Sequence, residues 1–226
     1  MKYLDKNDEE LLNTIILMSN FPSRSERIEA QMEKYYIDNP NNAEAAFAYG
    51  LLHMIKSSKK ENSLSTQNVD VFFEAYERVL KIIPDYWLVH ALKANVLLSI
   101  IEIVRYDDEL LETLDALLQM QDGTVQKEAY FIFPYICRAE YAFIIEQDRQ
   151  KCIDFLARGE KAIPVGTIKF PILKKYLFVR IKEFMGKIRT ANDYEIENKI
   201  RGLAKKYFTG DNQGHQNATK LRSDYL

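Results

Sequence analysis

The feature that most constrains this chain is the spacing of its apolar residues, which recur every three or four positions in one segment after another from Glu9 onward. Such spacing places apolar side chains on one face of a helix, whereas a half-buried strand needs strict alternation, which no stretch of any length shows. The 8 glycines and 6 prolines are few for an all-β protein built on tight turns. The sequence therefore predicts an all-α fold of about ten helices.

Prolines and polar stretches give the expected helix boundaries, because a residue that precedes proline is pushed out of helical geometry. Pro134 lies inside one predicted helix and is expected either to kink it or to divide it. The polar stretch 58–67 is predicted to be an exposed loop, and 208–226, rich in Gly, Asn, Gln and charge, a disordered tail after a single domain of residues 1–207. The predicted helices cover about 8–19, 24–39 or 26–39 (after Ser23 or Ser25), 42–57, 69–83, 86–105, 107–122, 125–146, 148–162, 170–187 and 192–207.

Three of these helices share one internal spacing and close on a proline. They read Ile28-xxx-Met32-xx-Tyr35-Tyr36-xxx-Pro40, Phe72-xxx-Tyr76-xx-Val79-Leu80-xxx-Pro84 and Cys152-xxx-Leu156-xx-Gly159-Glu160-xxx-Pro164. Two of the prolines are followed by a helix start that leads to a small residue, Gly50 or Ala94. This arrangement resembles tetratricopeptide (TPR) repeats, most clearly over residues 25–105. The resemblance implies antiparallel helical hairpins stacked as an α-solenoid, with the small residues where two helices approach closely.

The same resemblance implies a concave surface faced by the first helix of each hairpin. Its expected partner-binding residues are Glu44, Phe47, Leu51, Leu88, Ala91 and Asn95. TPR proteins that clamp a C-terminal carboxylate use Lys and Asn at such positions, but here Phe47 or Ala91 stands where the Lys is expected. The resemblance therefore implies a groove that selects apolar side chains of a protein or peptide partner, with buried aromatic anchors.

Charge is distributed unevenly along the chain. Residues 1–165 carry 18 Lys+Arg against 27 Asp+Glu, a net charge of −9, whereas residues 166–207 carry 11 against 4, a net charge of +7. The basic helices of residues 168–207 offer a second hypothesis, nucleic-acid binding, against the alternative of an ordinary solvated helix face. The pI of about 6.0 makes nucleic acid the weaker choice of partner. The expected basic patch consists of Lys174, Lys175, Arg180, Lys182, Lys205 and Lys206.

Residues that carry out catalysis are scarce. The chain has 3 histidines and 2 cysteines, and their spacing matches no metal site, redox pair or catalytic motif. Cys137 and Cys152 lie in apolar periodic segments and are expected to be small buried hydrophobes. Asp107, Asp108 and Glu109 stand at a helix start, where capping and the helix dipole favour carboxylates. We therefore expect no enzyme, metal or cofactor; an enzyme of unrecognised class would need a pocket where His53, His90 or the cysteines meet carboxylates.

The start of the chain lacks the basic and apolar regions of a secretory signal, and no run approaches the roughly 18 apolar residues that span a bilayer. A cytoplasmic protein that does not enter a membrane is expected. The leading functional hypothesis is a helical-repeat scaffold that binds a protein or peptide as an adaptor, regulator or inhibitor. The sequence does not indicate its oligomeric state.

Overall fold

The computed structural model describes residues 1–19, 22–59 and 66–209, and over these ranges the chain forms ten α-helices and no β-strand. The predicted all-α class is therefore confirmed. The helices are α1 Lys6–Ser19, α2 Pro22–Asp38, α3 Ala43–Lys59, α4 Thr66–Ile82, α5 Trp87–Ile100, α6 Asp107–Asp122, α7 Ile132–Ile144, α8 Arg149–Ala162, α9 Pro171–Thr190 and α10 Tyr194–Ala204. A 3₁₀ turn, η1 Ala129–Phe131, precedes α7, and a π turn, η2 Lys205–Thr209, follows α10.

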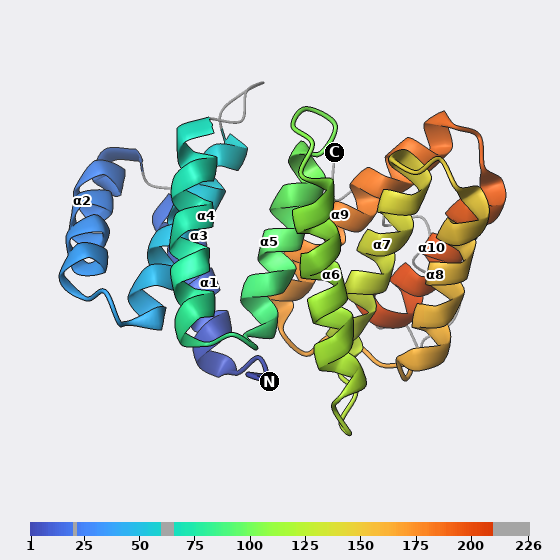
Figure 1. Ribbon diagram of the computed structural model, residues 1–226, viewed down its shortest axis with the longest axis horizontal. Helices are drawn as coiled ribbons and strands as arrows, with labels where there is room; N and C mark the ends of the chain where they lie inside the picture. Colours follow the sequence, from blue (N-terminus) through green and yellow to red (C-terminus); the bar gives the residue numbers. More distant parts are fainter. Residues whose placement is uncertain (20–21, 60–65, 210–226) are drawn as a thin grey trace.

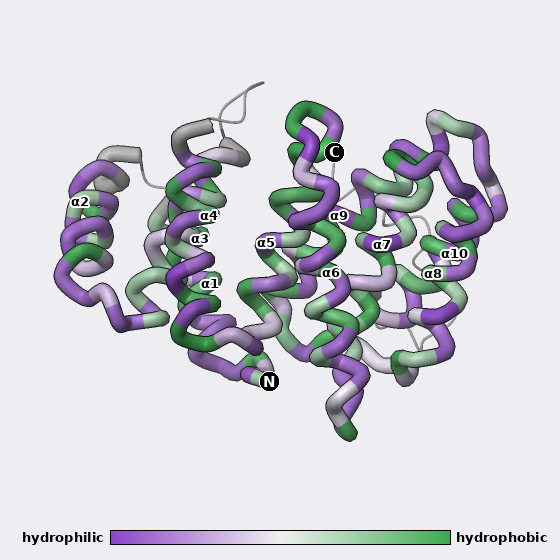
Figure 2. The backbone as a smooth tube through the Cα atoms, viewed as in Figure 1, coloured by the Kyte–Doolittle hydropathy of each residue, from purple (hydrophilic) through white to green (hydrophobic). Residues whose placement is uncertain are grey.

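Consecutive helices pack as hairpins in a solenoid-like row. The pairs α3/α4, α5/α6, α7/α8 and α9/α10 each share an interface, and Figure 1 shows the row extending from α2 at one edge to α8 at the other. The last hairpin, α9/α10, does not continue the row at its end. Helix α9 lies behind α5 and α7 in Figure 1 and packs against α1 and α7. Figure 2 shows hydrophilic and hydrophobic residues alternating around the helices, as expected where each helix buries one side.

The prolines end helices as expected. Pro40, Pro84 and Pro164 each lie two residues beyond the last residue of α2, α4 and α8. Gly50 of α3 also has the predicted role at a close helix contact, because a Cβ built there would lie 2.7 Å from Cδ1 of Tyr76 on α4. Gly159 plays the same part in the next-but-one hairpin, where a Cβ would lie 2.7 Å from Cβ of Tyr135.

Pro134 neither kinks nor divides a helix, contrary to both alternatives. The predicted helix 125–146 begins only at Ile132, so Pro134 falls in the first turn of α7. The backbone amides of a first turn have no partner within the helix, and a proline there forfeits no hydrogen bond. The prediction is wrong because the apolar residues of 129–131 continue the helical spacing, although they form a 3₁₀ turn.

The predicted end of the domain is also corrected. The predicted tail includes Phe208, but this residue is buried in η2 and its ring stacks on that of Phe178, with centroids 5.9 Å apart. The domain therefore extends at least to Thr209, and the rest of the predicted tail, 210–226, lies outside the described residues. Helices α3 and α4 each extend into the predicted loop 58–67, whose centre, 60–65, also lies outside them.

Candidate partner-binding surfaces

Most of the residues predicted to face a concave groove lie in the hydrophobic core. Phe47, Leu51, Leu88 and Ala91 are each at most 1% exposed. The ring of Phe47, for example, packs between those of Tyr76 and Tyr86, with both centroids 5.6 Å away. These four positions are therefore corrected from partner-binding residues to core residues, because side chains without accessible surface offer a partner no contact in this conformation.

Helix α9 reaches the first helices α3 and α5 through the side chain of Tyr176. Tyr176 of α9 accepts a hydrogen bond from Nδ2 of Asn95 at 2.8 Å, and its hydroxyl also lies 3.4 Å from the sulfur of Met54. Asn95, which is predicted to contact a partner, thus contacts the chain's own basic helix. The amphipathic pattern of 170–187 predicts a helix but gives no indication of where it packs.

A buried ion pair fixes the middle of α9 to the row. Arg180 Nε and Nη2 donate to the two carboxylate oxygens of Glu140 at 2.9 and 2.7 Å, and Nη2 also donates to the Leu98 carbonyl oxygen at 3.1 Å. The Nη1 group donates to Ser99 Oγ and to Glu183, each at 3.0 Å. Arg180 is 4% exposed and Glu140 is 0% exposed. Arg180 is therefore removed from the predicted basic patch, since a guanidinium with every donor group engaged inside the protein does not reach an external phosphate.

The environment of this pair also shifts its proton equilibria. Burial raises the pKa of the Glu140 carboxyl, and the Arg180 guanidinium and the Lys187 ammonium only partly offset this effect. Burial acts to lower the pKa of Arg180, but the attraction of the Glu140 carboxylate outweighs it, and the pKa is raised. Both shifts reflect a charge pair removed from solvent rather than groups ready to exchange protons with a substrate.

The start of α9 is held by an acidic residue from the other end of the chain. Glu9 of α1 accepts hydrogen bonds from the backbone amides of Ile172 and Leu173, the second at 3.2 Å. These amides belong to the first turn of α9, where no acceptor is available within the helix, and a carboxylate there also interacts favourably with the helix dipole. The basic helix and the acidic amino-terminal region are therefore joined within one molecule.

The other members of the predicted basic patch are partly engaged as well. Lys206 forms an ion pair with Glu160, and the ammonium of Lys182 lies 5.4 Å from the centre of the Phe178 ring. Lys175, Lys182 and Lys205 are exposed, and Lys174 is half-buried. The basic region therefore presents lysines to solvent, whereas Arg180, which was predicted to belong to the same patch, is buried.

The histidines and cysteines occupy separate packed positions. Nδ1 of His53 lies 2.8 Å from Oδ1 of Asn68 and its Nε2 lies 3.9 Å from the Glu29 carboxylate, whereas Nε2 of His90 lies 2.9 Å from the Pro84 carbonyl oxygen. Cys137 and Cys152 are free, buried thiols, as their sequence context suggested, and burial raises the pKa of Cys152 to about 12. Over the residues that the structure describes, no group of three or more His, Cys, Asp and Glu side chains is placed to hold a metal ion.

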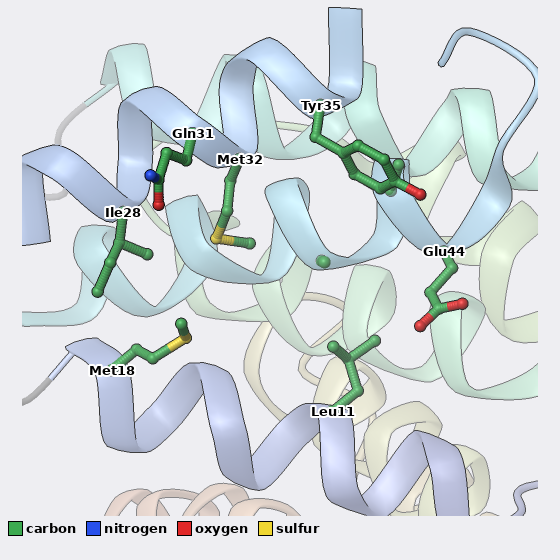
Figure 3. A pocket seen from close by; sticks show the side chains of 9 residues that line it. Leu11, Met18, Ile28, Gln31, Met32, Tyr35 and Glu44 are labelled. Atoms are coloured by element: carbon green, nitrogen blue, oxygen red, sulfur yellow. The ribbon is translucent and has the colours of Figure 1, made fainter. Parts of the chain in front are cut away.

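The sequence did not single out an open groove between α1, α2 and α3. It has a volume of about 270 Å³, and Figure 3 shows its side chains converging from the three helices. The small side chains of Ala45 and Ala48 lie at its α3 side. The complete lining is Leu11, Met18, Ile28, Gln31, Met32, Tyr35, Glu44, Ala45 and Ala48. The sequence does contain the apolar residues of this groove, at positions 11 and 18 of one helix and 28, 32 and 35 of the next. Helices usually bury such apolar stripes in the core, so the stripes alone do not indicate a groove.

Glu44 is the one carboxylate in the lining of this groove, and it is exposed. It lies in the first turn of α3, whose preceding residue Asn42 accepts a hydrogen bond from the Ala45 amide at 3.0 Å. No ion pair joins Glu44 to another residue that the structure describes. Of the six predicted partner-binding residues, Glu44 alone therefore faces open space beside apolar side chains.

Comparisons of this chain with models of known protein families, with curated proteins and with solved structures give no significant match. Among the described residues, no helix combines the length and the apolar character needed to cross a membrane.

Proposed function

We propose that this protein is a helical-repeat scaffold, similar to TPR proteins, that binds a protein or peptide partner in the groove between α1, α2 and α3. The observation that carries this proposal is the row of apolar side chains that stay only half-buried there, Leu11 and Met18 on one wall and Ile28 and Met32 on the other. A hydrophobic groove between helices is a common recognition site for a partner's apolar side chains. The protein would act in the cytoplasm as an adaptor, regulator or inhibitor.

The position of α9 makes the face of the first helices a less accessible site than this groove. Tyr176 and Arg180 of α9 contact Asn95 of α5 and Glu140 of α7, so a partner bound at these positions would have to displace α9 and break the Arg180–Glu140 pair. Breaking a buried ion pair costs about 3–5 kcal/mol. The groove between α1, α2 and α3 needs no such rearrangement.

The two alternative functions have weaker support. Nucleic-acid binding would use the basic patch, but Arg180 is buried, and Lys206, Arg189 and Arg201 are paired with Glu160 or Glu197. An enzyme of unrecognised class would need reactive side chains in a shared pocket. His53 lies beside one carboxylate, with Nε2 3.9 Å from Glu29, but neither His53 nor His90 lines the groove between α1, α2 and α3, and His90 contacts the Pro84 carbonyl.

A substitution that fills the groove tests the proposal. Ala48→Leu adds a bulky side chain at the α3 side of the groove, and Ala116→Leu is a matched control at a half-buried position on α6. Proteins captured from the native host by the unmodified chain should be retained by Ala116→Leu and lost with Ala48→Leu. A set of partners that is the same for both variants, with both still folded by circular dichroism, would place the binding surface elsewhere and refute the proposal.

A further inference from the structure

The size of the α1–α2–α3 groove indicates what kind of group it accepts. Its volume of about 270 Å³ lies just below the range of about 300–1,000 Å³ usual for small-molecule and cofactor pockets. It is also partly open to solvent rather than enclosed. These dimensions suit a few side chains projecting from a partner whose backbone stays outside.

The length of the groove indicates the spacing of those side chains. Leu11 and Met18 on α1 are seven residues apart, as are Ile28 and Tyr35 on α2, and seven residues of helix span about 10 Å, or two turns. Figure 3 shows Met18 facing Ile28 at one end of the groove, and Leu11 lying toward Tyr35 and Glu44 at the other. Apolar residues at positions i, i+3 or i+4, and i+7 of a partner helix cover two turns.

The walls of the groove are suited to this mode of binding. Met18 and Met32 face the groove from opposite helices, and methionine side chains adapt their shape to different apolar partners because they are unbranched and flexible. The short side chains of Ala45 and Ala48 on α3 leave room for a partner's side chains between α1 and α2. A partner helix placed there would add a fourth helix to α1, α2 and α3 and would complete the packing that α1 and α2 lack.

Glu44 indicates the charge of the partner. Its carboxylate lies at the Leu11–Tyr35 end of the groove, without an ion pair to any residue of the described ranges. Gln31 and the Tyr35 hydroxyl, the other polar groups of the lining, are neutral. A cationic side chain would complement this end, whereas an acidic one would be repelled by it.

We propose that the occupant of this groove is an amphipathic helix of a partner protein that presents apolar residues over two turns and a lysine or arginine against Glu44. This inference rests on the proposed function, since it specifies the partner of the same groove. Electrostatic complementarity would contribute orientation and specificity, while the apolar side chains provide most of the affinity.

Selection from a phage-displayed library of helical peptides tests the inference and does not require the partner to be identified first. The bait is the full chain, with counter-selection on Ala48→Leu. The peptides should share apolar residues at i, i+3 or i+4 and i+7, with Lys or Arg at one fixed position. A parallel selection on Glu44→Lys should enrich Asp or Glu at that position.

Fluorescence anisotropy with the best synthetic peptide then measures the charge preference. Glu44→Lys should weaken its binding by about 3-fold to 10-fold, the range expected for turning an exposed attraction into a repulsion. Replacing the peptide's basic residue with Glu should restore binding to Glu44→Lys. Thermal unfolding of Glu44→Lys, followed by circular dichroism, shows that the variant remains folded.

The outcomes separate this inference from the proposed function. Peptides that require the groove but show no charge preference, or that bind in an extended form, would refute the inference and leave the groove as a binding site. Peptides that bind Ala48→Leu as well as the unmodified chain, or a failure to enrich any peptide, would overturn both.

Discussion

Replacing Arg180 with methionine should strongly destabilise this protein, although its sequence context reads as an exposed basic helix face. The substitution removes two hydrogen bonds to Glu140 and one to the Leu98 carbonyl, and leaves a carboxylate of 0% exposure. Removing one partner of a buried ion pair costs about 3–5 kcal/mol. Lys187 Nζ remains 3.5 Å from the Glu140 carboxylate and partly compensates, so we expect about 3 kcal/mol.

Urea unfolding followed by far-ultraviolet circular dichroism measures the loss of unfolding free energy, and heating the same samples measures the change in Tm. For a domain of 150–250 residues, each 1 kcal/mol lowers Tm by about 2–4 °C, so Arg180→Met should lower Tm by roughly 6–12 °C. The slope of the free energy against urea should stay the same, because the surface exposed on unfolding hardly changes. The double variant Arg180→Met, Glu140→Met should lose less than Arg180→Met alone, since no unpaired charge remains inside.

The pH dependence gives an independent check. Burial raises the pKa of Glu140 in the folded protein, and loss of the guanidinium raises it further. A carboxyl whose folded pKa exceeds its unfolded value of about 4.3 binds protons more tightly when folded, so stability rises as pH falls toward that value. The deficit of Arg180→Met should therefore be smaller at pH 5 than at pH 8. A deficit below about 1 kcal/mol, or a double variant as unstable as the two single losses added, would refute the assignment of a buried pair.

Three further predictions concern glycine packing, the start of α9 and the cap of α10. Gly50→Ala should lower the unfolding free energy by about 1–3 kcal/mol because its Cβ would overlap Tyr76, whereas Gly186→Ala, with no atom within 4 Å of its Cβ, should raise it by about 0.5–1 kcal/mol in chemical denaturation. Glu9→Ala should cost about 1 kcal/mol and speed hydrogen exchange of the first amides of α9, while Glu10→Ala should do neither; equal effects would contradict the capping role. Hydrogen bonds from Arg149 lower the pKa of Asp193, so the stability that this N-cap contributes is present above the unfolded value of about 3.9 and is lost as pH falls through the folded pKa. Asp193→Ala should accordingly lose about 1 kcal/mol at pH 7 and less at pH 3 in thermal unfolding, and a loss independent of pH would contradict this.

Local features of this fold could be predicted because they depend on neighbours in the sequence. Apolar spacing and the stops at Pro40, Pro84 and Pro164 gave the helices, and the absence of a side chain at Gly50 gave the close contact with α4. The exact boundaries were less predictable. The apolar residues 129–131 match a helical spacing, but they form a 3₁₀ turn.

Long-range placement could not be predicted in the same way. Arg180 looks like any other cation on a basic helix, and only the position of Glu140 on α7 shows that it is buried. Four of the predicted binding positions assumed an open concave face, but Phe47, Leu51, Leu88 and Ala91 are buried in the core. The groove could not be predicted either. The apolar stripes of α1 and α2 look like core residues, and nothing in the sequence shows that their inner faces remain partly exposed to solvent.

The contact between Glu9 and the start of α9 has a consequence for the order in which the chain acquires its structure. The two ends of this contact are separated by 163 residues, so α1–α8 are synthesised before α9 exists to pack against α1 and α7. At about 5–20 residues per second, synthesis of the 50 residues from Glu140 to Thr190 takes roughly 3–10 s. During this interval the nascent chain carries an uncovered apolar face and an unpaired acidic residue. The amino-terminal hairpins therefore lack their packing contacts with α9 until this helix, one of the last to be made, has docked.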